Sequence, residues 1–514
     1  MKLGTLFLFA LASQIASAQN TNPPSAAPTS EWTASATEIP MRDGVKLHTI
    51  ILAPKHPAGL LPIMLVRTPY GSPEGALKSI QTDDANRLNF YGYIRVFQDI
   101  RGRHKSEGVF VMLRPPHPLA DSHGVDECTD TYDTIDWLVK HVSSNNGRVG
   151  MKGGSYDGWL AAMALIHPHP ALKAVSPQAP VADMFLGDDF HHNGAFRLSY
   201  GFEYVWMLES GKEEDTQWPI DLPDAYDWYL RLGPLANANL NYLHGTRPSW
   251  NDFVTHPNYD KFWKRQAISP YLDKPLTVPT LLVGGWYDQE DFYGPQRIYA
   301  ELTRHDPSRL AYLILGPWNH GGWESPSEAL GPIDFGSQTG TYDKENIEKP
   351  WFDHWLKGTN LTNFQNVWTF ETGLNRWVTG KNWPPRDSRT VNLYLQGGRT
   401  ASFQPSTGQD ADAFDSYVSD PKKPAPYRKG PILPTYGDNS TWDTWLLDDQ
   451  RLLEARTDIV AWKTAPLTQD VAIAGNVIAD LFASTTGTDS DWVVKLVDIY
   501  PDDNPTNPKL AGYE

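Results

Sequence analysis

Cysteine is almost absent from this chain of 514 residues, in which Cys128 is the only one. A single cysteine excludes an intramolecular disulfide framework, a cysteine-rich zinc site and a thioredoxin-type redox pair. Long apolar runs are also absent. No stretch of the chain reaches the roughly 18 uncharged apolar residues that a transmembrane helix requires. The sequence therefore predicts no membrane span.

Basic residues are too few for a nucleic-acid-binding protein. Lys and Arg total 44 against 61 Asp and Glu, which gives a formal net charge of −17 and a pI near 5.3. Proteins that bind nucleic acid normally present a basic face, so we expect no nucleic-acid partner. An acidic field favours cationic small molecules instead. The length predicts two to four domains of about 150 residues each.

The first residues have the pattern of a secretory signal. Lys2 supplies a positive start, Leu3–Ala12 is a short apolar stretch, and Ala16-Ser17-Ala18 fits a small-residue cleavage site. The following residues are rich in Pro, Ser, Thr and Asn, a composition typical of disorder. We therefore expect a signal peptide over 1–18, a disordered leader over 19–35, and a secreted or periplasmic mature protein.

Strand-type and helix-type segments alternate along most of the chain. Runs such as LPIMLVRTPY, VPTLLVGGW and LAYLIL are separated by helical patterns such as WLAAMALI. This alternation predicts a mainly parallel sheet covered by helices. A segment rich in Trp, Tyr, Asn, His and Pro, from Phe185 to about Leu272, interrupts the pattern and indicates a helical insertion. After Arg389 the composition becomes β-like, which predicts an all-β domain of sandwich or jelly-roll type.

The segment RVGMKGGSYDGWLAAMALI is typical of a nucleophile turn. A strand leads through Ser155 directly into a helix, a geometry that exposes the serine hydroxyl. The N–H of Tyr156, at the helix start, can donate to an oxyanion. In the common G-x-S-x-G pattern a glycine stands where this chain has Asp157, and Gly158 comes one residue later. Taken alone, the segment also fits an ordinary glycine turn.

Two further residues follow the serine in the order expected of a catalytic triad. Asp288 lies just after the strand VPTLLVGGW, and His320 lies in the loop GPWNHGG after the strand LAYLIL. A serine hydroxyl becomes nucleophilic when an imidazole takes its proton, and an acid fixes the tautomer of that imidazole. We therefore predict Ser155 as nucleophile, His320 as base and Asp288 as the orienting acid.

Together the motifs RTPY, GGSYDG, WYDQED, GPWNHGG and SDPKKPAPY resemble those of the α-amino-acid ester hydrolases, in the group of cocaine esterase and X-Pro dipeptidyl-peptidase. The resemblance implies an α/β hydrolase with a helical cap insertion and a C-terminal jelly-roll domain. The relatives' β domain continues beyond the equivalent of Glu514, so we expect the last domain to be incomplete. The expected boundaries are 36–184 and 274–385 for the α/β-hydrolase domain, 185–273 for the cap, and 386–514 for the jelly-roll-like β domain.

The same resemblance assigns roles to residues that no local pattern singles out. It implies that the Tyr70 hydroxyl joins the Tyr156 N–H as an oxyanion donor. It also implies that Asp189, Glu290 and Asp291 bind the α-ammonium group of the substrate. Three acids facing one cation make chemical sense, because the cation relieves their mutual repulsion. Asp188 beside Asp189 leaves the choice between these two neighbours open.

The function that follows is hydrolysis of α-amino-acid esters or amides through an acyl-enzyme, with acyl transfer to amines such as β-lactam nuclei. The alternatives are an X-Pro dipeptidyl-peptidase, a general carboxylesterase, and an inactive glycan-binding protein that uses the aromatic residues. No cofactor is expected, and no metal, because the adjacent His191 and His192 lack a chelating spacing. The resemblance also implies a homo-oligomer, a tetramer in relatives.

The proposed substrate and base also predict a pH dependence. Free α-amines titrate near ~7.7 to 8.0 and must be protonated to be bound by carboxylates, whereas an unperturbed imidazole such as His320 titrates near ~6.5 and must be neutral. The sequence therefore predicts an activity maximum between these values.

Overall fold

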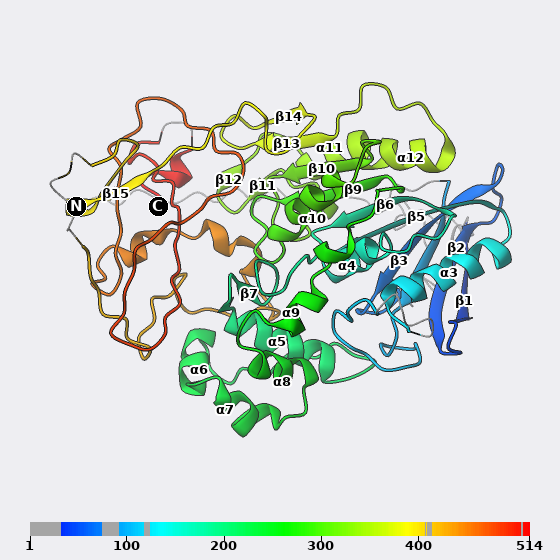
Figure 1. Ribbon diagram of the computed structural model, residues 1–514, viewed down its shortest axis with the longest axis horizontal. Coiled ribbons are helices and arrows are strands. Elements are labelled where there is room, and N and C mark those ends of the chain that lie inside the picture. The colour runs from blue at the N-terminus through cyan, green and yellow to red at the C-terminus, as the bar shows by residue number, and fades with distance from the viewer. Residues whose placement is uncertain (1–31, 74–91, 118–123, 407, 409–413, 505–506) are drawn as a thin grey trace, which may run out of the picture.

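The structure is a computed structural model that describes residues 32–73, 92–117, 124–406, 408, 414–504 and 507–514 (Figure 1). Within these residues, ten strands form one twisted sheet. From edge to edge it contains β1 (Trp32–Pro40), β2 (Lys46–Pro54), β4 (Ile94–Asp99), β3 (Leu61–Thr68), β5 (Asn145–Gly154), β6 (Leu172–Gln178), β9 (Thr280–Gly285), β10 (Ala311–Gly316), β13 (Val367–Glu371) and β14 (Arg376–Gly380). The strands from β4 to β13 run parallel, β2 and β14 run antiparallel to them, and β1 pairs antiparallel with β2 at the edge. The prediction of a mainly parallel sheet is confirmed.

Two hydrophobic clusters lie on the two faces of this sheet. Successive side chains of a strand point to opposite faces, and in β3 the residues Ile63 and Leu65 join one cluster while Met64 joins the other. The first cluster also takes residues from α3 (Glu127–His141), α4 (Tyr156–Met163) and α10 (Tyr293–Arg304); the second takes residues from α12 (Lys349–Lys357). The central strands are therefore apolar on both faces, as parallel strands between helix layers must be.

Local sequence signals fix the ends of these helices. Asp126 caps α3, because its side chain accepts the Thr129 N–H at 2.8 Å while its own N–H donates to Thr129 Oγ1 at 2.9 Å. At the other end of the fold, α12 stops at Gly358, whose φ of 75° is the left-handed conformation that glycine adopts at low cost. The turn before α12 is a π-helix, Lys344–Glu348.

The insertion between β6 and β9 is helical and covers the carboxyl ends of the strands. It contains α5 (Leu198–Glu209), α6 (Ala225–Leu232), α7 (Ala236–Ala238), a π-helix (Asn239–Leu243), α8 (Pro248–Thr255) and α9 (Lys261–Gln266), after the short hairpin of β7 (His191–His192) and β8 (Ala195–Phe196). Aromatic rings fill its core, with Trp228 and Trp250 each 1% exposed. The aromatic-rich composition of this segment is thus explained by packing within the cap.

The jelly-roll prediction for the C-terminal region is not confirmed. After Arg389, the described residues form one two-stranded sheet, β15 (Tyr394–Gln396) with β16 (Thr400–Ser402), and otherwise loops and short 3-10 helices. Within the predicted β domain, the segments 470–485 and 491–500 pair with no neighbouring strand in the part of the chain that the structure describes. Their apolar side chains consequently stay exposed, for example Ile478 at 81% and Val493 at 76%. Alternation of apolar residues suffices for a strand only when a partner strand supplies the hydrogen bonds.

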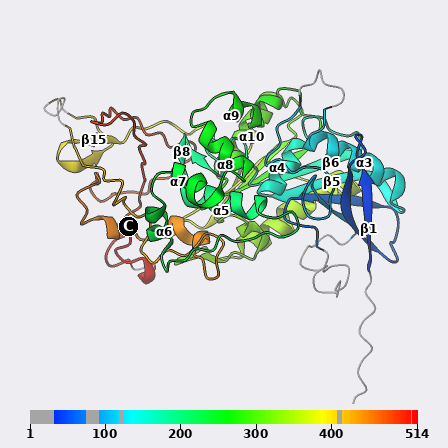
Figure 2. The ribbon, with the colours of Figure 1, turned by 90° about the horizontal axis from the view of Figure 1, so that it is seen from below.

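The first strand and the C-terminus lie at opposite ends of the described part of the molecule. Figures 1 and 2 show β15 and the C-terminus at the opposite end from β1. The predicted leader, 19–35, is too long at its C-terminal end, because β1 begins at Trp32 and pairs with β2. The predicted signal peptide, 1–18, lies outside the described residues. Among the described residues, no helix is long and apolar enough to cross a membrane.

Candidate active site

Ser155 occupies the sharp turn between β5 and α4. Its φ and ψ are 61° and −127°, a conformation that residues with a side chain rarely adopt. The turn is held by a 2.9 Å hydrogen bond from the Ser155 N–H to the carbonyl of Gln178 on β6. Strain of this kind is stored at functional sites when the surrounding structure enforces it. The structure therefore places the predicted nucleophile on a strand-to-helix turn.

Two glycines make this turn sterically feasible. A Cβ atom on Gly158 would lie 2.3 Å from the Gln178 carbonyl oxygen, and one on Gly153 would lie 2.4 Å from the Asp157 carbonyl oxygen. Both contacts are far shorter than real Cβ atoms tolerate. The close approach between helix and sheet thus needs glycine at the third position after the serine, which accounts for the departure from G-x-S-x-G.

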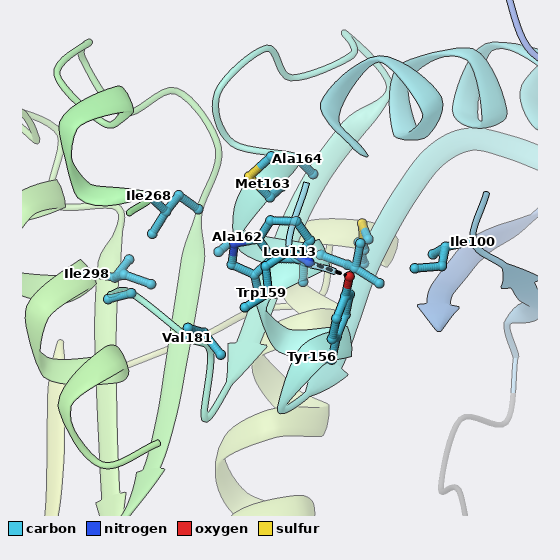
Figure 3. Packing of buried hydrophobic residues seen from close by; sticks show 14 of the residues in the cluster. Ile100, Leu113, Tyr156, Trp159, Ala162, Met163, Ala164, Val181, Ile268 and Ile298 are labelled. Atoms are coloured by element: carbon cyan, nitrogen blue, oxygen red, sulfur yellow. Dashed lines mark hydrogen bonds between the residues drawn. The ribbon is translucent and has the colours of Figure 1, made fainter. Parts of the chain in front are cut away.

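Tyr156 offers its backbone N–H at the first position of α4, where an N–H has no partner within the helix. Its side chain points away from the turn into the core, and its hydroxyl accepts the Leu113 N–H at 2.8 Å (Figure 3). The buried ring contacts Trp159 with centroids 5.4 Å apart. The side chain of Tyr156 is therefore an anchor, and the backbone N–H is the group available to an oxyanion.

Tyr70 lies in the loop after β3, next to this turn. Its ring meets that of Tyr156 edge-on, with centroids 6.5 Å apart. Its hydroxyl lies 2.8 Å from the hydroxyl of Tyr204 on the cap helix α5. Burial, followed by the negative charge of Asp157, raises the pKa of Tyr70 well above its ordinary value. The phenol thus remains a hydrogen-bond donor at neutral pH.

His320 and Asp288 come together at the carboxyl ends of β9 and β10. His320 Nδ1 lies 3.0 Å from both Asp288 carboxylate oxygens. Asp288 Oδ1 also accepts the backbone N–H groups of Glu290 and Asp291, at 2.8 and 2.9 Å. Burial opposes ionisation of Asp288, but the charge of His320 and these hydrogen bonds lower its pKa. A carboxylate held in this way keeps the Nδ1 proton in place and leaves Nε2 as the reactive nitrogen.

The three predicted substrate-binding acids lie close to one another, and Asp189 and Glu290 face His320. The Tyr200 hydroxyl on α5 bridges Asp189 Oδ1 at 2.7 Å and Glu290 Oε2 at 2.9 Å. Both carboxylate oxygens of Asp291 are buried and have no hydrogen-bond partner among the described residues. Burial, then repulsion from Asp189 and the neighbouring acids, raises the pKa of Asp291 well above its ordinary value. Burial and the charge of Glu290 likewise raise the pKa of Asp189 to about 6, against the hydrogen bond from Tyr200.

Asp188 and Asp189 have different surroundings. Asp188 Oδ2 accepts the N–H groups of Ala182 and Asp183, and its Oδ1 accepts that of Gly294 at 2.8 Å. Both carboxylate oxygens of Asp188 are therefore occupied by hydrogen bonds from the loop backbone. Asp189, whose φ is 49°, turns toward Tyr200 and Glu290 instead. The geometry thus favours Asp189 as the member of the cluster.

Positive charge is scarce around these acids. In the described part of the chain, the cationic side chain within 4.0 Å of the Asp189, Glu290 or Asp291 carboxylates is His320, whose Nε2 lies 3.5 Å from Glu290 Oε2. Arg197 is close by, but it donates to the carbonyl oxygens of Asp189 and Gln289 rather than to a carboxylate. The site therefore has a surplus of buried carboxyl groups, and a cationic ligand would stabilise their ionised forms. Across the described residues, no group of three or more His, Cys, Asp or Glu is arranged to hold a metal ion.

The sequence analysis missed three aromatic residues of this site. Tyr200 and Tyr204 lie one turn apart on α5 and stack with centroids 5.6 Å apart. Trp442, from the C-terminal region, stacks on Tyr200 at 5.5 Å and donates from Nε1 to Glu290 Oε1 at 2.6 Å. The spacing of the two tyrosines on a predicted helix could have suggested a shared face. Nothing local points to Trp442.

Comparisons with known proteins agree with this geometry. The family described as X-Pro dipeptidyl-peptidase (S15 family) matches residues 43–322, and the X-Pro dipeptidyl-peptidase C-terminal non-catalytic domain matches residues 355–511. Cocaine esterase of Rhodococcus sp. (strain MB1 Bresler) is 29% identical over 491 residues, covering 91% of this chain and 80% of that protein.

Two solved structures are similar over nearly the whole chain. An aminopeptidase from the marine sediment archaeon Thaumarchaeota archaeon is 42% identical with a TM-score of 0.89, covering 97% of this chain and 83% of its own. An α-amino acid ester hydrolase is 37% identical with a TM-score of 0.87, covering 97% of this chain and 84% of its own.

Proposed function

This chain belongs to the X-Pro dipeptidyl-peptidase (S15) family of serine esterases and peptidases, and we propose that it hydrolyses esters of α-amino acids. The observation that carries the proposal is the buried cluster of Asp189, Glu290 and Asp291 beside His320. An α-ammonium group is the cation that such a cluster would recognise, because it lies one carbon atom from the reacting carbonyl. Similarity to an α-amino acid ester hydrolase supports the same substrate class.

In the proposed reaction, Ser155 Oγ attacks the ester carbonyl while His320 Nε2 takes its proton. The developing oxyanion accepts hydrogen bonds from the Tyr156 N–H and the Tyr70 hydroxyl. The intermediate collapses when the bond to the alkoxide breaks, and the imidazolium returns the proton to that leaving group. Asp288 holds the Nδ1 proton of His320 throughout.

Water then attacks the acyl-enzyme by the same route in reverse and releases the free amino acid. An amine in place of water gives an amide, so we also propose acyl transfer to amines, including β-lactam nuclei. A neutral amine is the stronger nucleophile, which favours this outcome wherever the amine concentration is high.

The position of the cluster discriminates against dipeptide release. Glu290 Oε2 lies 3.5 Å from the imidazole nitrogen that serves the reacting carbonyl. In a dipeptidyl substrate a whole additional residue separates the ammonium group from that carbonyl, so its cation would lie farther from His320. Amides of single α-amino acids fit the same geometry as esters, and the 42% identity to an aminopeptidase supports them as a second substrate class.

A substrate panel tests the proposal. We expect kcat/KM for phenylglycine methyl ester to exceed that for phenylacetic methyl ester, phenylglycine amide and a Gly-Pro anilide, with Ser155→Ala as the inactive control that still binds ligand. Equal values for the amino and des-amino esters would indicate a general carboxylesterase. A preference for the Gly-Pro anilide would indicate a dipeptidyl-peptidase.

A further inference from the structure

His320 lies between two carboxylates that use different ring nitrogens. Nδ1 contacts Asp288 at 3.0 Å, and Nε2 faces Glu290 Oε2 at 3.5 Å. Among the hydrogen bonds of the described residues, none joins Nε2 to Ser155. The nitrogen that must accept the serine proton is therefore paired with an acid in the ligand-free protein.

Further negative charges face the ring from two other segments, and the uncharged ring of Trp323 packs against it with centroids 6.1 Å apart. Besides Asp288 and Glu290 on the loop after β9, Asp189 faces it from the loop after β6, and Asp443 faces it from the C-terminal region. Burial disfavours a charged imidazole, but the charges of Asp288, Glu290 and Asp189 outweigh it and raise the pKa of His320 to about 10. A ring in this field keeps its second proton at neutral pH, and a protonated imidazole cannot act as a base.

Glu290 itself is held in a fixed position. Trp442 Nε1 donates to its Oε1 at 2.6 Å, and the Tyr200 hydroxyl shares one proton between Oε2 of this carboxylate, at 2.9 Å, and Asp189 Oδ1, at 2.7 Å. The oxygen that accepts from Tyr200 is the same one that faces His320. Because both oxygens are fixed, a change in the protonation state of His320 requires no movement of Glu290. A new positive charge next to the carboxylate is sufficient.

We propose that Glu290 is a substrate-operated switch, which pairs with protonated His320 in the free protein and with the substrate's α-ammonium group in the complex. The incoming cation replaces the imidazolium as the counter-charge of the cluster, and His320 Nε2 releases its proton to solvent. At neutral pH, the base of Ser155 is then mostly neutral when an α-ammonium group is bound and mostly protonated when none is bound. This inference rests on the proposed function, and it places discrimination against uncharged esters in the chemical step as well as in binding.

Labelling of Ser155 by an uncharged alkyl fluorophosphonate tests the switch without an amino-acid substrate. In the wild-type protein we expect the labelling rate to be low at neutral pH and to rise about tenfold for each pH unit, as a base of high pKa requires. Methylammonium chloride should accelerate labelling at neutral pH in a saturable manner, relative to sodium chloride at equal ionic strength.

The matched variant is Glu290→Gln, which keeps the shape of the side chain and removes its charge. An opposite charge within about 4–6 Å shifts a pKa by about 1–3 units, so labelling of this variant at neutral pH should be about 10-fold faster or more. Methylammonium should no longer accelerate it. The control is Glu301→Gln on α10, which removes a carboxylate paired with Arg297 and Arg304 and should leave the labelling rate unchanged.

The outcomes separate this inference from the proposed function. Identical pH profiles in the wild-type protein and Glu290→Gln, or methylammonium that only slows labelling, would overturn the switch. If the wild-type protein still prefers amino esters to des-amino esters, the cluster binds substrate without controlling the base, and the proposed function stands. Loss of that preference would instead overturn the proposed function.

Discussion

Trp442 Nε1 donates a 2.6 Å hydrogen bond to Glu290 Oε1, although the two residues are 152 positions apart in the sequence. Figure 1 shows how this arises, because the C-terminal region passes beside the cap and the loops at the carboxyl ends of the strands. Further bonds dock it there: the Thr435 N–H donates to Glu203 on α5 at 2.8 Å, and the Ala225 N–H donates to the Ile432 carbonyl at 2.7 Å. The region matched to the non-catalytic domain therefore completes the candidate site.

Replacing Trp442 with Phe should lower the catalytic efficiency of the protein toward amino esters. The phenyl ring keeps the stacking on Tyr200, but Glu290 loses a donor, and an unsatisfied buried acceptor costs about 1–3 kcal/mol. We expect kcat/KM for phenylglycine methyl ester to fall about tenfold. Trp445→Phe is the matched control, because the Trp445 indole N–H has no hydrogen-bond partner in the part of the chain that the structure describes. Equal losses in the two variants would show that ring packing, and not the hydrogen bond, matters.

Tyr70→Phe should lower kcat by about 10²-fold, the effect of losing one oxyanion donor. Its pKa lies well above the ordinary value, so the wild-type hydroxyl donates throughout the neutral range. Tyr226→Phe, which removes a hydroxyl bonded to the Pro424 carbonyl outside the site, serves as the control. The measurement is kcat with a saturating ester. Full activity of Tyr70→Phe would contradict the assigned role.

Gly158→Ala should destabilise the protein and abolish activity together. The added methyl group would lie 2.3 Å from the Gln178 carbonyl oxygen, so α4 would have to move away from β6 and carry Ser155 with it. Overpacking of this kind costs about 1–3 kcal/mol or more. Gly59→Ala is the control, because no atom lies within 4 Å of its added Cβ. Thermal unfolding and ester turnover are the two measurements; unchanged values of both would refute the steric argument.

The sequence could predict the central sheet and the turn at Ser155 because both depend on local patterns. Buried parallel strands are short apolar runs between turn residues, and a serine between a strand and a helix is marked by its flanking glycines. Asp288 and His320 could be placed for the same reason, since each follows a recognisable strand. Their mutual distance of 3.0 Å then follows from the adjacency of β9 and β10.

What the sequence could not predict depends on long-range packing. The choice between Asp188 and Asp189 depends on a left-handed backbone at Asp189, with φ of 49°, which turns one side chain to the loops and the other to the site. Trp442 enters the site only through the docking of a distant segment. The predicted β domain after Arg389 also depends on long-range pairing. Its alternating residues find no partner strand within the described residues.

The structure leads to a different pH dependence of activity from the one that the sequence predicts. An ordinary imidazole would give an acid limb near ~6.5, but the carboxylates around His320 raise its pKa to about 10 against the effect of burial. A raised pKa means that the ring keeps its proton until the pH is high. For an uncharged ester, kcat/KM should therefore increase through the neutral range and level off only near that value.

In the complex with an amino ester, the pKa of His320 should be lowered and not raised. The bound ammonium group places a positive charge beside Glu290, which lowers the pKa of His320 and preserves the neutral base at lower pH. The acid limb of kcat should thus lie at least about one pH unit lower for phenylglycine methyl ester than for phenylacetic methyl ester, a tenfold difference in rate on that limb. Profiles of kcat for both esters check this, with Ser155→Ala used to subtract spontaneous hydrolysis. Acid limbs at the same pH would mean that the bound cation does not change the pKa of His320. The carboxylates would then contribute to binding alone.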